Sequence, residues 1–167
     1  GSGVEWEGPL LRLAEGLKQG ATLETAPPDP RFKGTLLPYQ QKGVDWLNFL
    51  YNWGFSGLLA DEMGLGKTVQ VLAFLSRLRT NLPVLIVAPT SLLFNWRAEI
   101  DRFLPGRDPF VLISYTTLRL NEELYSQREF EAIVLDESNA IKTAATQTAR
   151  AAYKLKGRFK ICLSGTP

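Results

Sequence analysis

The sequence contains one cysteine, one methionine and no histidine among its 167 residues. Because Cys162 has no partner, no disulfide framework is possible, which fits a reducing intracellular compartment. No apolar run reaches the roughly 18 residues that a membrane-spanning helix needs, so we expect neither a membrane span nor a signal peptide. The formal net charge is only +2. Proteins that bind nucleic acid through charge alone usually carry a far stronger basic bias.

The composition is that of an ordinary globular protein, with 45% hydrophobic and 22% charged residues. A chain of this length supports one well-buried domain rather than two. Residues 1–3 look like a cloning scar. In residues 4–30 we expect a short helix and then a linker, because leucines recur at helical spacing before a proline-rich stretch that cannot continue a helix. The main domain is then expected over residues 31–167.

Apolar strands and amphipathic helices alternate from Leu36 onward. The pattern predicts helices at 38–53, 67–79, 91–103, near 116–125 and near 144–155, and strands at 56–60, 84–88, 110–114, 132–136 and 159–164. Thr90 or Ser91 is expected to be the N-cap of the third of these helices. Strands that are apolar throughout and separated by helices indicate a parallel sheet covered on both faces. The fold class is therefore α/β.

The stretch LADEMGLGKT, residues 59–68, follows the first predicted strand and opens the next helix. Gly64 and Gly66 would let the backbone approach a phosphate closely, and the helix start adds positive potential. Lys67 would reach the outer phosphates and the Thr68 hydroxyl would bind Mg²⁺. Asp61 stands where the usual pattern has its first glycine, a change that removes no ligand. The alternative interpretation is a glycine-rich turn with a solvated lysine.

Asp136 and Glu137 end the predicted strand AIVLD, so they should emerge at the same sheet edge as the glycine loop. One acid there can hold Mg²⁺ through water, and the second can orient or deprotonate an attacking water. Alone, such a pair could be a simple helix cap. Together with Lys67 it predicts ATP hydrolysis chemistry.

Five stretches of the chain, in order, resemble motifs I, Ia, Ib, II and III of the Swi/Snf-type ATPases of helicase superfamily two. They are LADEMGLGKTVQ, VLIVAPTSLLFNWRAEI, ISYTTLR, VLDESNAIKT and LSGTP, and TLLPYQQKGVDWL resembles the family's Q motif. The resemblance covers residues from about 32 to 167. It implies an α/β fold with a RecA-like parallel sheet, helices on both faces and a single lobe. It further implies ATP and Mg²⁺ as cofactors, and double-stranded DNA as the partner of a two-lobed parent protein.

The resemblance assigns roles to individual residues. Lys67, Asp136 and Glu137 would be catalytic, Thr68 and Asp136 would hold the metal, and Gln40 would read the adenine edge. The residues expected to bind nucleotide are Gln40, Asp61, Glu62, Met63, Gly64, Leu65, Gly66, Lys67 and Thr68. Without the family, Gln40 could equally be a solvated helix residue.

Other motif residues would serve DNA and the coupling between lobes. Thr90, Ser91 and Thr116 match positions that touch DNA phosphates in the family, although each could equally be a helix cap. Asn139, Ser164 and Thr166 would couple the nucleotide to the lobe interface. Trp46 and Trp96 lie in apolar stripes, so we expect both in the core rather than stacked on bases.

The chain departs from the family pattern at several points. Asn139 stands where histidine or glutamine is usual, and Leu37 where arginine commonly precedes the Q motif. The connection between residues 103 and 110 is shorter than the family pattern, through a deletion or through residues absent from this numbering. The chain stops after motif III, so we expect an excised first lobe that is nearly inactive alone. A parent protein of this kind is expected in the bacterial cytoplasm or the eukaryotic nucleus.

Two alternatives remain open at this point. The chain could be a nucleotide-responsive binding module without useful hydrolysis, or the lobe of an RNA helicase.

Overall fold

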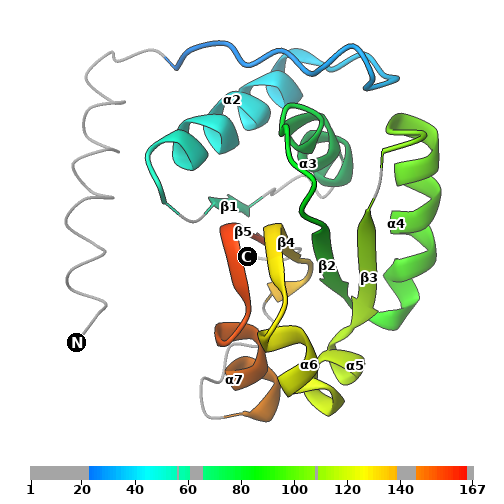
Figure 1. Cartoon of the computed structure of the whole chain (residues 1–167). Helices are drawn as coiled ribbons and strands as arrows, with labels where there is room; N and C mark the ends of the chain where they lie inside the picture. The colour runs from blue at the N-terminus through cyan, green and yellow to red at the C-terminus, as the bar shows by residue number, and fades with distance from the viewer. Residues whose placement is uncertain (1–22, 56, 61–65, 108, 139–145, 165–167) are drawn as a thin grey trace.

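The computed structural model describes residues 23–55, 57–60, 66–107, 109–138 and 146–164 of the chain (Figure 1). The elements are α2 (Pro38–Asn52), β1 (Gly57–Ala60), α3 (Lys67–Leu75), β2 (Val84–Ala88), α4 (Thr90–Phe103), β3 (Phe110–Ser114), α5 (Tyr115–Leu120), α6 (Glu122–Ser126), β4 (Glu129–Leu135), α7 (Gln147–Tyr153) and β5 (Lys156–Ser164). No helix among the described residues is long and apolar enough to cross a membrane. The cloning scar and helix expected before residue 23 lie outside the described residues.

The strands form one five-stranded sheet in the order β1-β5-β4-β2-β3. Every pairing in it is parallel. In β2 all five residues are buried, as expected for a strand covered on both faces. The parallel α/β sheet predicted from the sequence is therefore confirmed.

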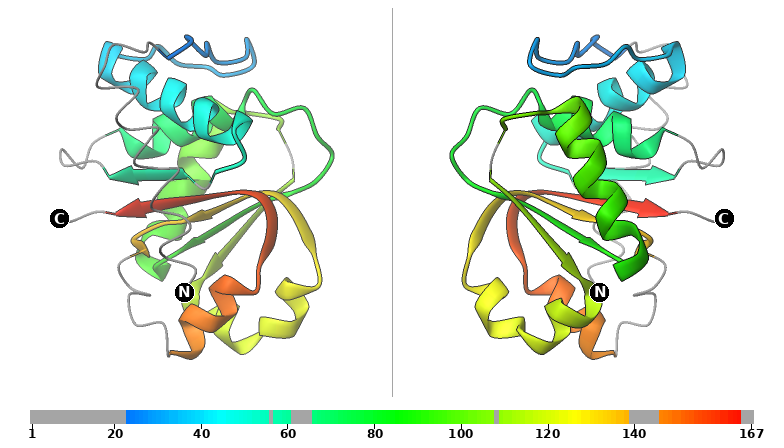
Figure 2. Two further views of the ribbon diagram at one scale, coloured as in Figure 1. Left: turned by 90° about the vertical axis from the view of Figure 1, so that its left-hand side faces the viewer. Right: turned by 90° about the vertical axis from the view of Figure 1, so that its right-hand side faces the viewer.

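Helices cover both faces of the sheet (Figure 2). Along β2, alternate side chains point to opposite faces. Val84 and Ile86 pack in the core under α2, α3 and α4. Leu85 and Val87 pack in a second core with residues of α5 and α7. The result is the RecA-like three-layer arrangement, with one core on each side of the sheet.

Helix α3 ends four residues earlier than the sequence pattern suggested, at Leu75 instead of Arg79. The C-cap is Ser76, whose hydroxyl donates to the Ala73 carbonyl and accepts from the backbone N–H of Asp29 at 3.0 Å. Leu78 remains buried even though it lies beyond the helix. The chain beyond the helix continues in a tighter turn, in which the N–H of Leu78 donates to the Leu75 carbonyl at 3.1 Å, and this turn keeps Leu78 in the core.

The single helix expected near 116–125 is instead two short helices, α5 and α6. Asn121 separates them with non-helical backbone angles of φ −125° and ψ 38°. Its side-chain amide donates to the Thr117 carbonyl at 2.9 Å, which satisfies a backbone group at the break. Strands β4 and β5 each begin three residues before the predicted start, at Glu129 and Lys156.

Residues 23–35, here called the N-terminal strap, lie across α2 and the end of α3 (Figure 1). Two bonds attach the strap to α2. The backbone N–H of Ala26 donates to Asp45 Oδ1 at 2.7 Å, and the Gln41 side chain donates to the Ala26 carbonyl at 2.8 Å. The proline-rich linker is therefore docked on the domain through its backbone groups.

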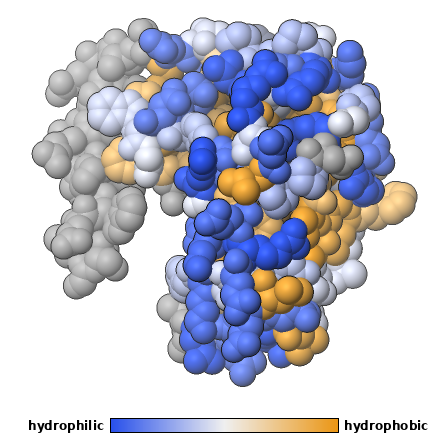
Figure 3. Space-filling model, in the orientation of Figure 1, coloured by the Kyte–Doolittle hydropathy of each residue, from blue (hydrophilic) through white to orange (hydrophobic). Residues whose placement is uncertain are grey.

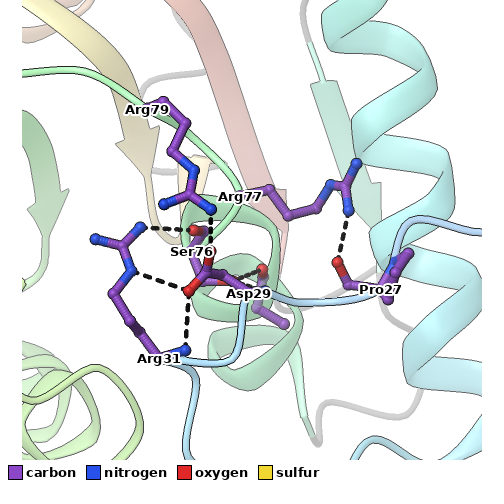
Figure 4. Close-up of polar contacts among 7 residues, drawn as sticks. Pro27, Asp29, Arg31, Ser76, Arg77 and Arg79 are labelled. Atoms are coloured by element: carbon purple, nitrogen blue, oxygen red, sulfur yellow. Dashed lines mark hydrogen bonds and ion pairs between the residues drawn. The ribbon is translucent and has the colours of Figure 1, made fainter.

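Asp29 attaches the strap to the end of α3 (Figure 4). Its Oδ1 accepts from both the backbone N–H and the Nε of Arg31, each at 2.9 Å, and its Oδ2 pairs with Arg79. Arg77 donates to the Pro27 carbonyl close by. The backbone N–H of Arg31, followed by the charges of the two arginines, holds the pKa of Asp29 below its ordinary value of 3.8. In Figure 3, hydrophilic side chains cover the top of the molecule, where the strap lies.

We expect stability to fall in acid through Asp29. Because the folded protein lowers the pKa of this carboxyl, its contribution is present above pH 3.8 and is lost as the pH falls through the lower folded value. Asp29→Asn should lower the Tm at neutral pH and flatten the loss of Tm below pH 3.8, measured by circular dichroism. Asp101→Asn is the control, since Asp101 forms only an exposed pair with Arg97. Equal effects of the two variants would contradict the assignment.

Candidate nucleotide site

The two predicted clusters of the nucleotide site line one pocket at the carboxyl edge of the sheet. Lys67 and Thr68 enter it from the start of α3, and Asp136 and Glu137 enter it from the end of β4. The pocket has a volume of about 360 Å³. Its other lining residues are Gly66, Val69, Leu92, Asn95, Glu99 and Leu163. The remaining loop residues of the prediction, Asp61 to Leu65, lie outside the described residues.

Gly66 is required by both its conformation and its surroundings. It is the N-cap of α3 and has φ +85°, a left-handed conformation that favours glycine. A Cβ atom at this position would lie 2.5 Å from Nε2 of Gln40 and 3.2 Å from the hydroxyl oxygen of Tyr39. The backbone at Gly66 is therefore in close contact with the start of α2.

Gln40 is almost fully buried, at 8% exposed, beside the loop and outside the set of pocket-lining residues. Its Oε1 accepts from the backbone N–H of Leu37 at 2.8 Å and so closes the first turn of α2. This bond fixes the amide with its Nε2 against Gly66. The buried position is incompatible with a solvated helix glutamine. The residue that replaces the family's arginine, Leu37, contributes its backbone here, and its side chain is exposed.

Asp136 is held from several sides at the end of β4. Its backbone N–H donates to the Val87 carbonyl at 2.8 Å, and its own carbonyl accepts from the Tyr115 hydroxyl at 2.7 Å. Its Oδ2 accepts from the indole Nε1–H of Trp96 at 2.7 Å. Burial of the phenol, and secondarily the charge of Asp136, raise the pKa of Tyr115. Tyr115 therefore stays protonated and remains a hydrogen-bond donor.

Glu137 has a strained backbone, with φ +53° in a residue that is not glycine. Its backbone N–H donates to Oδ1 of Asp136 at 2.9 Å. The next residue, Ser138, donates its hydroxyl to the Leu163 carbonyl at 3.1 Å. This bond links the end of β4 to the end of β5. Asn139 itself and Thr166 lie outside the described residues.

Helix α4 forms a wall of the pocket that the sequence analysis missed. Leu92, Asn95 and Glu99 line the pocket from successive turns of this helix. Oε2 of Glu99 is buried and makes no hydrogen bond within the described part of the chain. The spacing of three and four residues places them on one helix face. That spacing was visible in the sequence, but it did not indicate that this face turns toward the glycine loop.

The oxygen atoms of this pocket fit a magnesium ion. Mg²⁺ prefers hard oxygen ligands and usually takes one or two protein ligands together with substrate phosphates. Thr68 and Asp136, which line the same pocket, can supply a hydroxyl and a carboxylate. Across the described ranges, no group of three or more acidic or cysteine side chains could hold a metal alone. The arrangement suits an ion that arrives with a nucleotide.

The residues expected to touch DNA lie at the same sheet edge, on its surface. Thr90, Ser91 and Thr116 are all exposed. Ala88 pairs with Ser114, so the segments that begin at Thr90 and Tyr115 follow neighbouring strand ends. The capping prediction for α4 was wrong: its N-cap is Pro89, and no side chain caps it. In α5 the cap is Ser114, which accepts from the Thr117 N–H, so Thr116 is not a cap either.

The two tryptophans differ in burial. Trp96 is only 1% exposed and belongs to the core, as predicted. Trp46 is partly buried against the core and stacks on Phe49, with ring centroids 6.2 Å apart. Ser164 ends β5 opposite Ala60.

The sequence profile of the SNF2-related domain family matches residues 39–110 and 106–167. The two matched segments meet at the connection that precedes β3, where the sequence analysis finds the chain shorter than the family pattern. Together they cover α2, the sheet and every residue described above as lining the pocket.

Similar proteins cover most of this chain but are much longer. YwqA of Bacillus subtilis is 42% identical in an alignment 164 residues long, which covers 83% of this chain and 18% of YwqA. The chromatin-remodeling ATPase INO80 of Drosophila melanogaster is 37% identical in an alignment 175 residues long, which covers 84% of this chain and 11% of that protein. The Sulfolobus solfataricus SWI2/SNF2 ATPase core in complex with dsDNA matches with a TM-score of 0.78 and 32% identity, over 88% of this chain and 35% of that chain. The chain thus spans less than a fifth of the length of these two curated relatives.

The crowding around Gly66 gives a prediction about stability. Gly66→Ala should lower the free energy of unfolding by the left-handed backbone penalty, about 1–2 kcal/mol, plus the displacement of Gln40. Gly106→Ala is the matched control, because Gly106 has φ +79° and nothing within 4 Å of an added Cβ. Urea unfolding should show a larger loss for Gly66→Ala, and the loss caused by Gly66→Ala should be smaller when it is measured in a Gln40→Ala background. Identical losses for the two alanine variants would show that the close approach is unimportant.

Proposed function

The chain belongs to the SNF2-related domain family, and from that premise we propose that it is the first ATP-binding lobe of an ATP-driven translocase on double-stranded DNA. The observation that supports this most is the single pocket shared by Lys67, Thr68, Asp136 and Glu137. A lysine at a helix start and two acids across a pocket match the needs of a triphosphate with its cation.

Each pocket residue has a role in this proposal. Lys67 and the backbone of the loop bind the outer phosphates, and Thr68 and Asp136 hold Mg²⁺. Glu137 orients or deprotonates the attacking water, and its strained backbone fits a residue kept for chemistry. Gln40, fixed against Gly66, is positioned at the loop where the adenine of a bound nucleotide would be read. Asp61 to Leu65 complete the phosphate loop.

DNA binding is proposed for the exposed edge that carries Thr90, Ser91 and Thr116. Small hydroxyl groups and backbone amides can position a phosphate backbone without reading its sequence. Ser164 and Thr166, with Asn139, are proposed to couple the nucleotide to a second lobe of the parent protein. Support comes from the similarity to the Sulfolobus solfataricus SWI2/SNF2 ATPase core, which was solved in complex with dsDNA.

The lobe alone should bind nucleotide weakly and turn it over very slowly. Stabilisation of the charge in phosphoryl transfer commonly needs an arginine that another lobe or partner supplies. The intact parent protein is therefore the form in which activity is to be measured.

In the intact parent, we expect duplex DNA to stimulate ATP hydrolysis. Glu137→Gln should abolish steady turnover while nucleotide binding persists, because the amide cannot accept the proton of the attacking water. Lys67→Ala should lose binding as well. Phosphate release and a fluorescent nucleotide titration measure the two effects. Glu129→Gln, an exposed residue at the opposite end of β4, should leave both unchanged.

The same assay separates the alternatives. Stimulation by RNA in place of duplex DNA would favour an RNA helicase. Nucleotide binding without steady turnover by the wild-type parent would favour a nucleotide-responsive binding module.

A further inference from the structure

Trp96 connects the buried core to an acid of the nucleotide pocket. Its indole is 1% exposed, and its Nε1–H donates to Oδ2 of Asp136 at 2.7 Å in a buried bond. Trp96 belongs to α4, the helix whose residues Asn95 and Glu99 line the same pocket. The bond therefore joins the α4 wall of the pocket to the wall formed by the end of β4.

Both oxygens of the Asp136 carboxylate are oriented by neutral donors. Oδ2 accepts from the indole of Trp96, and Oδ1 accepts from the backbone N–H of Glu137. An ionised carboxylate offers about four acceptor positions, so two bonds leave capacity on both oxygens. A guanidinium or ammonium donor would also orient the group, but it would offset the negative charge that a cation needs. The indole orients Asp136 and leaves its charge available.

The indole is a rigid donor, and its place is set by packing. A tryptophan side chain has two rotatable torsions, and here core residues surround the ring on helix α4. The bond from Glu137 comes from the adjacent residue, whose own backbone is strained. Trp96 thus orients the Asp136 carboxylate from outside the chain segment 136–137.

We propose that Trp96 is a positioning residue of the nucleotide site, whose indole N–H sets the orientation in which Asp136 receives magnesium with the nucleotide. This inference rests on the proposed function of the pocket. In metal sites, groups that hydrogen-bond to a ligand orient it, and their removal commonly lowers metal affinity about 10- to 100-fold. The sequence signal for Trp96 was ambiguous, because its place in an apolar stripe indicates only that it is buried.

The test uses Trp96→Phe, which keeps an aromatic ring and removes the donor. Binding of a fluorescent adenine nucleotide to this chain is titrated over a range of Mg²⁺ concentrations. We expect nucleotide affinity without Mg²⁺ to stay the same, and the Mg²⁺ concentration for half-maximal enhancement to rise about 10-fold. Trp46→Phe is the matched control, since Trp46 is a partly buried tryptophan on α2 that stacks on Phe49. It should behave as the wild type.

A second measurement needs no variant to fold. In ¹H–¹⁵N spectra of the wild type, the Trp96 indole resonance should shift when nucleotide and Mg²⁺ are added together, and less with nucleotide alone. The indole resonance of Trp46 should stay in place. Unchanged Mg²⁺ dependence in a folded Trp96→Phe variant, or an unmoved Trp96 resonance, would overturn the inference. Wild-type protein that binds no nucleotide at any Mg²⁺ concentration would overturn the proposed function itself, and this inference with it.

Discussion

The parallel direction of the five strands is the constraint on which the site depends. Because every strand runs in the same direction, every carboxyl end reaches the same edge, and the segments that follow them share one space. Ala88 pairs with Ser114 and Val87 pairs with Leu135, so the ends of β2, β3 and β4 are level. Residues far apart in the chain meet there without long loops. Reversal of β1 or of β4 would separate the lysine, which follows β1, from the acids, which follow β4.

The acid at the end of β4 shows how much of the fold is used to hold one residue. A strand, a tyrosine hydroxyl, a tryptophan indole and a neighbouring amide all contact Asp136. These bonds come from β2, α5, α4 and the residue that follows. Such redundancy explains how the chain tolerates the positive φ of Glu137, since the residue before it cannot move to relieve the strain. The bonds that fix Asp136 and the strained backbone of Glu137 therefore belong together.

The sequence was sufficient to predict the sheet, most of the helices and the convergence of Lys67 with Asp136. Those features follow from local patterns: apolar runs, helical spacing and a glycine loop between a strand and a helix. The resemblance to Swi/Snf-type ATPases, which the family profile confirms, added an expected role for the residues of each motif.

The errors came where contacts outside the apolar and helical pattern accompany the local structure. Helix α3 stops at Leu75, where its C-cap Ser76 accepts a bond from the strap, and no pattern within the helix reveals that contact. Asn121 divides a helix by a side-chain bond that competes with helical geometry. The pocket face of α4 could not be predicted, because spacing defines a helix face but not its rotation about the sheet. Trp96 is the clearest case, since a buried tryptophan and a tryptophan bonded to an acid look alike in sequence.

The exposed first turn of α4 and the buried side chain of Trp96 belong to one and the same helix. Its first turn, at Thr90 and Ser91, is exposed at the sheet edge, and Trp96 lies six residues along the same helix. A helix rises about 1.5 Å per residue, which puts the backbone of Trp96 roughly 9 Å along the axis from Thr90. A rotation of α4 as one body would therefore move the exposed turn and the donor of the Asp136 hydrogen bond together.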